Sequence, residues 1–165
     1  RLSGAIASTG ASRLLILGDL LHAGAGVTDT LIERVGAWRQ GFGGQVVVVP
    51  GNHDRAVGSR VFAELAEAWG LTIAEPVLEE DGLAFQHEPG EVAGRFVWAG
   101  HIHPAVRIGG GGDRVKLPCF VVGDACGILP AFSRFTAGGA RHGLVGRALA
   151  IVEGQVVELA AGVAV

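Results

Sequence analysis

The chain has 165 residues, of which 49% are hydrophobic and 18% charged, and this length suits one globular domain with a sizeable core. The hydrophobic fraction excludes a disordered chain, and no apolar stretch approaches the roughly 18 residues of a membrane-spanning helix. The net charge of −3 is less basic than is usual for a protein that binds nucleic acid by neutralising phosphates, so any phosphate must be held locally by metals or a few arginines.

The beginning of the sequence and its cysteines bear on processing and location. The chain has no methionine and begins inside a helix-like phrase at 1–6 that lacks a signal-peptide pattern, so we expect a further segment before Arg1. Cys119 and Cys126 are too few for a disulfide scaffold. They indicate buried, reduced thiols in a cytoplasmic protein.

The first half of the chain alternates strand-like and helix-like segments. Residues 13–18 and 45–50 are short apolar runs, typical of strands buried on both faces. Apolar side chains recur at helical spacing over 28–40 and over 61–69, and a glycine follows each segment. The pattern at 30–33 fits a capping box near the start of the first helix.

The second half is predicted to consist of strands joined by hairpins. Asp81-Gly82 and Glu153-Gly154 are two-residue turn signals, and glycines 109–112 predict a flexible hairpin tip. The strand-like runs are 77–80, 83–87, 96–100, 106–108, 115–117, 120–123, 148–152 and 156–159. Strand–helix units followed by hairpins predict one α/β domain over 1–165, with two mixed β-sheets packed together and helices outside.

Polar residues gather directly after the predicted strands, where open α/β sheets place their ligands. Five of the six histidines lie in such positions, within the segments 18–22, 51–55, 86–89 and 100–104. Neutral imidazoles, a carboxylate and an amide oxygen are the ligand types of borderline divalent metals. Together these segments predict a metal site.

Each of these residues also has a structural interpretation when taken alone. Asp19 could cap a turn, and 52–54 could be a loop built on Asx turns. A lone His87 would more often be a partly buried imidazole with a hydrogen-bond partner. His101 and His103, two residues apart, could occupy opposite faces of an extended segment. The metal hypothesis therefore depends on all of them occurring together.

The combined pattern resembles a known superfamily. Gly18-Asp19, Gly51-Asn52-His53-Asp54, His87 and Gly100-His101-Ile102-His103 resemble motifs two to five of the calcineurin-like metallophosphoesterases in order and spacing. The resemblance implies the metallo-dependent phosphatase fold, a four-layer αββα sandwich. Segments 87–89, 100–107, 117–120 and 129–136 resemble the bacterial metallophosphoesterases associated with a DNA ligase, and 18–22 resembles the repair-nuclease branch.

The resemblance implies a centre of two divalent metal ions, with Mn²⁺ as the expected ion and Fe²⁺ or Zn²⁺ as alternatives. Asp19 would bridge both ions. Asn52, His87 and His101 would complete one site. His103 would serve the other site, which in the family takes two more ligands from an Asp-x-His motif that this sequence lacks. We therefore expect the strand bearing that motif to precede the sequence given.

The implied mechanism is hydrolysis of a phosphate ester. Two cations about 3.5–4 Å apart can hold a bridging hydroxide and neutralise the phosphoryl oxygens during in-line attack. His53 would donate a proton to the leaving oxygen, and Asp54 would orient the His53 imidazole. His22 would face the substrate, while Arg55 and Arg134 would bind phosphate. The alternatives are a surface turn for His22, a solvated side chain for Arg55 and a mobile loop for the stretch that contains Arg134.

Three functions remain open from the sequence. The first is a phosphodiesterase or endonuclease acting on DNA in repair, with an ATP-dependent DNA ligase and associated repair proteins as partners and no membrane attachment. The second is a small-molecule phosphodiesterase or phosphatase for a cyclic nucleotide or dinucleotide, which the acidic composition suits. The third is a non-catalytic repair scaffold, which would have no need of the proton donor His53. We expect the first.

Overall fold

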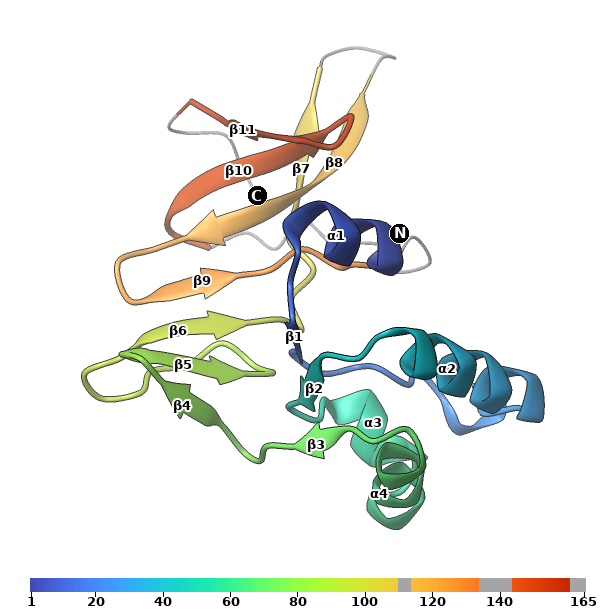
Figure 1. Cartoon of the computed structure of the whole chain (residues 1–165). Helices are drawn as coiled ribbons and strands as arrows, with labels where there is room; N and C mark the ends of the chain where they lie inside the picture. Colours follow the sequence, from blue (N-terminus) through green and yellow to red (C-terminus); the bar gives the residue numbers. More distant parts are fainter. Residues whose placement is uncertain (110–113, 134–143, 161–165) are drawn as a thin grey trace. The chain divides into compact units, whose positions relative to one another are not determined.

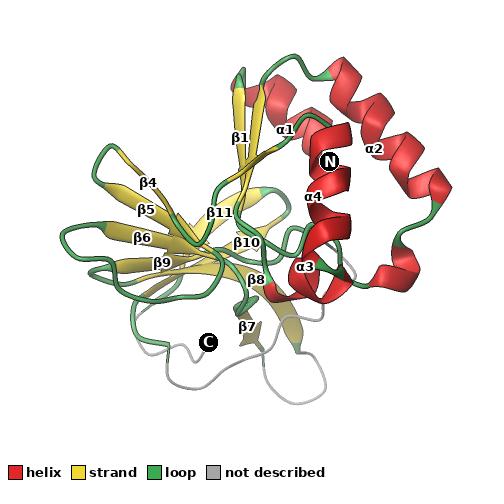
Figure 2. Cartoon of the chain, turned by 90° about the horizontal axis from the view of Figure 1, so that it is seen from below, coloured by secondary structure: helices red, strands yellow, loops and turns green. Residues whose placement is uncertain are grey.

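A computed structural model describes residues 1–109, 114–133 and 144–160, and the chain divides into two compact units, Arg1–Leu78 and Glu79–Val165 (Figure 1). The first unit contains a 3-stranded sheet, and an 8-stranded sheet is built from the remaining strands. The described helices belong to the first unit, whereas the second is described as strands and their connections (Figure 2). The mixed α/β class with two sheets is confirmed. Over the described residues, no helix is both long enough and apolar enough to cross a membrane.

The sheet of the first unit is parallel. Its order is β1 (Arg13–Ile16), β2 (Gln45–Val48) and β3 (Thr72–Ile73), with Arg13 opposite Gln45 and Val48 opposite Ile73. β1 and β2 coincide with the two predicted apolar runs, and the three valines of β2 are buried. Because parallel neighbours end at the same sheet edge, the segments that follow the three strands are brought together.

Four α-helices and one short 3₁₀ turn complete the description of this unit. They are α1 (Leu2–Thr9), η1 (Gly24–Gly26), α2 (Asp29–Gly41), α3 (Asn52–Val57) and α4 (Ser59–Ala68). The N-cap of α2 is Thr28, whose Oγ1 accepts a hydrogen bond from Leu31 N at 3.3 Å, so the helix begins earlier than the pattern at 30–33 indicated.

The core of the first unit lies between these helices and β2. Phe62 and Trp69 pack with Val48 and Leu21, and Trp69 Nε1 donates to the carbonyl oxygen of Ile32 at 3.2 Å. Within α4, Val61 is 43% exposed whereas Phe62 is buried, so the face of the helix that packs on the core includes Phe62 and not Val61. The bulkier aromatic side chain fills the space above the sheet.

The larger sheet has the order β11-β10-β8-β9-β6-β5-β4, and β7 pairs with β8. Its strands are β4 (Leu78–Glu80), β5 (Leu83–Gln86), β6 (Phe96–Ala99), β7 (Ala105–Ile108), β8 (Val115–Val122), β9 (Cys126–Ile128), β10 (Arg147–Val152) and β11 (Gln155–Glu158). β8 is one strand where two runs were expected, and it passes through Pro118 where its partner changes from β7 to β10. Proline has no N–H to donate, which suits such an exchange point.

Both predicted two-residue turns are present. Asp81 and Gly82 have φ values of 51° and 79°, and Glu153 and Gly154 have 49° and 84°. Positive φ at both central residues is the geometry that matches the twist of a two-stranded hairpin. Of the expected glycine tip at 109–112, residues 110–112 lie outside the described part of the chain.

The core of the second unit forms around β8 and β10. Val106, Cys119, Val121 and Ala150 are buried there. Both cysteines are free, as expected, and burial raises the pKa of the Cys119 thiol to about 11. Burial also raises the pKa of the Cys126 thiol. A raised pKa keeps both thiols protonated and unreactive at neutral pH.

An exposed ion pair joins β10 to the edge strand β11. Arg147 Nε and Nη2 donate to the two carboxylate oxygens of Glu158 at 2.7 and 2.8 Å, which lowers the pKa of Glu158. We expect the Arg147→Gln variant to raise that pKa toward its ordinary value, as measured by an NMR titration of the Glu158 side-chain carbonyl. Because the folded-state pKa is the lower one, the pair stabilises the fold at neutral pH and ceases to do so as pH falls through it. An unchanged Glu158 titration in the variant would contradict this.

Candidate active site

In the first unit, the site is built on the segments that follow β1 and β2. Gly18 and Asp19 come shortly after β1 and have φ values of 83° and 55°, so the chain turns sharply there. Asp19 Oδ1 accepts a hydrogen bond from the backbone N–H of His53 at 3.1 Å. This bond joins the segment after β1 to α3, whose first residue, Asn52, is exposed.

Asp54 is fully buried and ties the same two segments together through the main chain. Its Oδ1 accepts from Leu21 N at 2.7 Å, and its Oδ2 accepts from Gly51 N at 2.9 Å. The sequence predicts that this carboxylate orients the His53 imidazole. Both of its oxygens instead accept hydrogen bonds from backbone N–H groups, one at the turn into α3 and one in the segment after β1. Asp54 therefore positions the backbone of the site.

The His53 imidazole is held by His22. His53 Nδ1 lies 2.9 Å from the main-chain carbonyl oxygen of His22, and the two rings stack with centroids 4.3 Å apart at 27°. A carbonyl oxygen only accepts hydrogen bonds, so Nδ1 carries a proton. The Nε2 of His53 is then the nitrogen that can gain or lose a second proton, as a general acid or base requires.

Arg55 follows on the next turn of α3. Its Nε donates to Glu75 Oε1 at 3.1 Å, and both side chains are about half exposed. Sequence reasoning missed Glu75, which is 20 residues away in the chain. Arg55 and Glu75 follow the ends of β2 and β3, so only knowledge that these strands pair in parallel would have predicted their contact.

In the second unit, His87 and His101 follow two neighbouring parallel strands. β5 pairs with β6 so that Gln86 lies opposite Ala99, and His87 comes directly after this register. Gly100 N donates to the carbonyl oxygen of His87 at 2.9 Å and fixes the two strand ends to each other.

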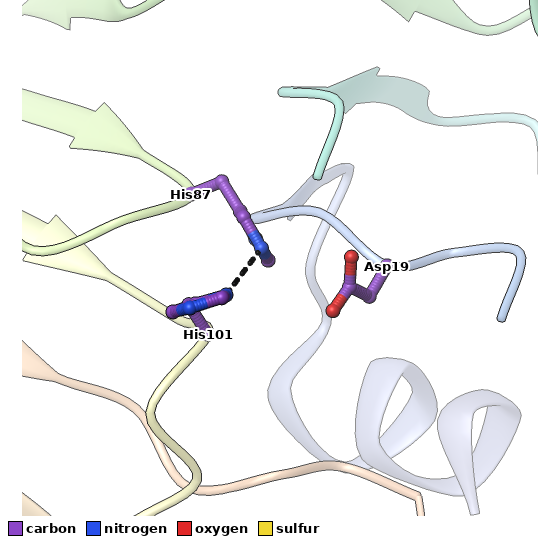
Figure 3. Close-up of side chains that lie close together, drawn as sticks. All are labelled: Asp19, His87 and His101. Carbon is purple, nitrogen blue, oxygen red and sulfur yellow. Dashed lines mark hydrogen bonds between the residues drawn. The ribbon is translucent and has the colours of Figure 1, made fainter. Parts of the chain in front are cut away.

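The two imidazoles lie edge to face, with centroids 4.9 Å apart at 77°. His101 Nδ1 lies 3.1 Å from His87 Nε2, as the dashed line in Figure 3 marks. Two nitrogens that bind one ion at about 2.1 Å with tetrahedral or octahedral angles lie about 3.0–3.4 Å apart. The His87–His101 pair therefore fits a shared metal ion, and the His87 side chain is buried.

His103 and Arg134 are the remaining predicted residues. His101 and His103 have φ values of 63° and 54°, so both residues between β6 and β7 adopt the left-handed backbone conformation. His103 is half-buried and precedes Pro104, whose carbonyl oxygen accepts from Cys119 N at 3.1 Å. The loop is thus anchored to β8. Arg134 lies outside the described residues.

Comparisons with known proteins identify the family. No protein-family model and no curated protein matches the chain. The crystal structure of the nuclease MPE from Pseudomonas putida is similar to it, with 31% sequence identity and a TM-score of 0.83. The similarity covers 96% of this chain and 76% of the nuclease. The chain belongs to the family of this nuclease.

Membership of the MPE nuclease family agrees with the fold. The two sheets and the helices correspond to the metallophosphoesterase-like architecture expected from the sequence. Nearly the whole chain takes part in the match.

Proposed function

We propose that the protein is a divalent-metal-dependent phosphodiesterase that cleaves nucleic acid, and that it acts on DNA. The observation that carries the proposal is the His87–His101 pair, whose nitrogens are spaced for one ion in a chain 31% identical to a nuclease. The motifs further favour the calcineurin-like group associated with a DNA ligase.

We assign the metal ligands by their chemistry. Asp19, His87 and His101 each offer one ligand atom of a type that borderline divalent ions accept. We propose that Asn52 joins them and that Asp19 also serves a second ion together with His103. Bound ions of this kind neutralise phosphate charge and make water nucleophilic near neutral pH. Mn²⁺ is our expected ion, with Fe²⁺ or Zn²⁺ as alternatives.

The remaining site residues act on the substrate. His53 would deliver a proton from Nε2 to the leaving oxygen of the ester, because Nδ1 is occupied by the His22 carbonyl oxygen. The His22 ring would cover one face of this imidazole. Arg55 and Arg134 would bind non-bridging phosphate oxygens, since a guanidinium matches phosphate geometry.

The chain's charge suggests how the enzyme reaches DNA. A net charge of −3 provides little attraction to a polyanion, so we propose that an ATP-dependent DNA ligase and repair proteins present the substrate. We also propose that 1–165 acts as one catalytic domain. Its two free cysteines favour the cytoplasm.

The proposal is tested by hydrolysis of bis(p-nitrophenyl) phosphate with Mn²⁺, beside p-nitrophenyl phosphate. We expect diester turnover that falls at least about 100-fold with chelator, because the ions carry the charge stabilisation. The Asp19→Ala variant should lose bound metal, as measured by inductively coupled plasma mass spectrometry. It should lose activity as well. Diester turnover that survives full metal removal would refute the proposal.

The acidic composition favours a second candidate, a phosphodiesterase for small nucleotides. The dependence of activity on salt concentration distinguishes the two candidate functions. Cleavage of DNA through several phosphate contacts should weaken steeply between low and physiological salt, whereas turnover of a cyclic dinucleotide should change little.

A further inference from the structure

The Arg55–Glu75 pair has a geometry that suits substrate selection. Glu75 Oε1 binds the Nε edge of the Arg55 guanidinium at 3.1 Å. This is the only hydrogen bond that the described residues make with the Arg55 side chain, so its two terminal nitrogens are open to another partner. Both side chains are partly exposed, at 42% and 51%, so solvent and solutes reach them.

Arg55 lies close to the residues we assign to the site. It is three residues after Asn52 on α3, and residues at this spacing lie on the same side of a helix. Val48 of β2 is paired with Ile73 of β3, so the ends of these strands adjoin, and Glu75 reaches α3 from the end of β3. The Glu75 carboxylate therefore lies at the same edge of the sheet as Asn52.

An exposed ion pair of this kind adds little to stability. Its effect is on the charge that a ligand meets. A phosphodiester carries one negative charge, whereas a phosphomonoester carries close to two above its second pKa of about 6. Glu75 offsets part of the Arg55 charge, so it disfavours the second negative charge of a monoester more than it disfavours the diester.

We propose that Glu75 is a specificity-determining residue, which makes Arg55 select phosphodiesters over phosphomonoesters. Arg55 contacts the phosphate through its terminal nitrogens, while Glu75 acts through Arg55. This rests on the proposed function, because it requires that substrate phosphate binds beside α3.

The test is the Glu75→Gln variant, which keeps a neutral acceptor of the same shape. We expect the ratio of kcat/KM for bis(p-nitrophenyl) phosphate over p-nitrophenyl phosphate to fall roughly three- to tenfold, mainly through a lower KM for the monoester. The matched control is Glu79→Gln, because Arg95 Nε and Glu79 Oε2 form a similarly exposed pair at 3.3 Å in the other unit. The control should leave the ratio unchanged.

A binding measurement separates this inference from the activity. The Nε–H resonance of Arg55 is followed by NMR while methyl phosphate or dimethyl phosphate is added. We expect the Kd of methyl phosphate to tighten roughly three- to tenfold in Glu75→Gln, with little change for dimethyl phosphate. Equal changes for both anions, or none, would overturn the inference. Suppose the wild-type protein hydrolyses neither ester, but Glu75→Gln tightens the binding of methyl phosphate and not that of dimethyl phosphate. The proposed function then fails and the selectivity stands.

Discussion

Replacing His53 by alanine is expected to lower kcat for diester hydrolysis by about 100-fold or more, which is the usual effect of losing a general acid. The structure supports this because Nδ1 is held by the main-chain oxygen of His22, which leaves Nε2 to exchange protons with the substrate. The loss should be larger for a dinucleotide than for an activated aryl ester, since a poor leaving group depends more on protonation. Steady-state kinetics on both substrates measure it.

Two further results show whether His53 acts in this way. Metal content should remain at the wild-type value in His53→Ala, and its collapse would mean that His53 is a ligand. The matched variant is His22→Ala, which removes the ring stacking but keeps the carbonyl oxygen that His53 contacts. It should reduce kcat much less than His53→Ala does.

The second large effect is on stability. We expect Asp54→Ala to lower the free energy of unfolding by about 3 kcal/mol or more, because two buried backbone donors lose a charged acceptor. These donors are the N–H groups of Leu21 and Gly51, and Asp54 itself is fully buried. Urea unfolding followed by circular dichroism measures the change.

Graded variants test the cause. Asp54→Asn keeps one carbonyl oxygen but turns an amide N–H₂ toward one of the two donors, so its loss should be intermediate. Glu64→Ala, at an exposed position of α4, should change the free energy of unfolding by no more than about 0.5 kcal/mol. If Asp54→Ala were as stable as wild type and only inactive, the carboxylate would act on the chemistry and not on the backbone.

Much of the fold could be predicted from local sequence signals. A few neighbouring residues are enough to predict the β2 strand from its valines and the two turns from their residues 81–82 and 153–154. β3 and α3 were missed because two and six residues are too few to show a period. β9 was missed for the same reason, and its Gly127 lies against the Trp98 ring, where a side chain would overlap it.

The sequence predicts which residue types form the candidate site, but it does not predict their hydrogen-bond partners. Histidines that follow apolar runs indicate ligands at strand ends, and His87 and His101 do adjoin. The partners of Asp54 could not be foreseen, because every residue has a backbone N–H and sequence does not distinguish Leu21 from its neighbours. The Arg55–Glu75 pair likewise depends on strand pairing that only the folded chain defines.

The left-handed backbone at the site has a thermodynamic consequence. Asp19, His101 and His103 have φ values of 55°, 63° and 54°, a region that costs a residue with a Cβ about 1 kcal/mol or more relative to glycine. A chain shaped by stability alone would favour glycine at these three positions. Carboxylate and imidazole groups at these positions therefore carry a conformational cost. Under the ligand assignment proposed above, one ion bound by Asp19 and His101 and a second bound by Asp19 and His103 would offset part of that cost.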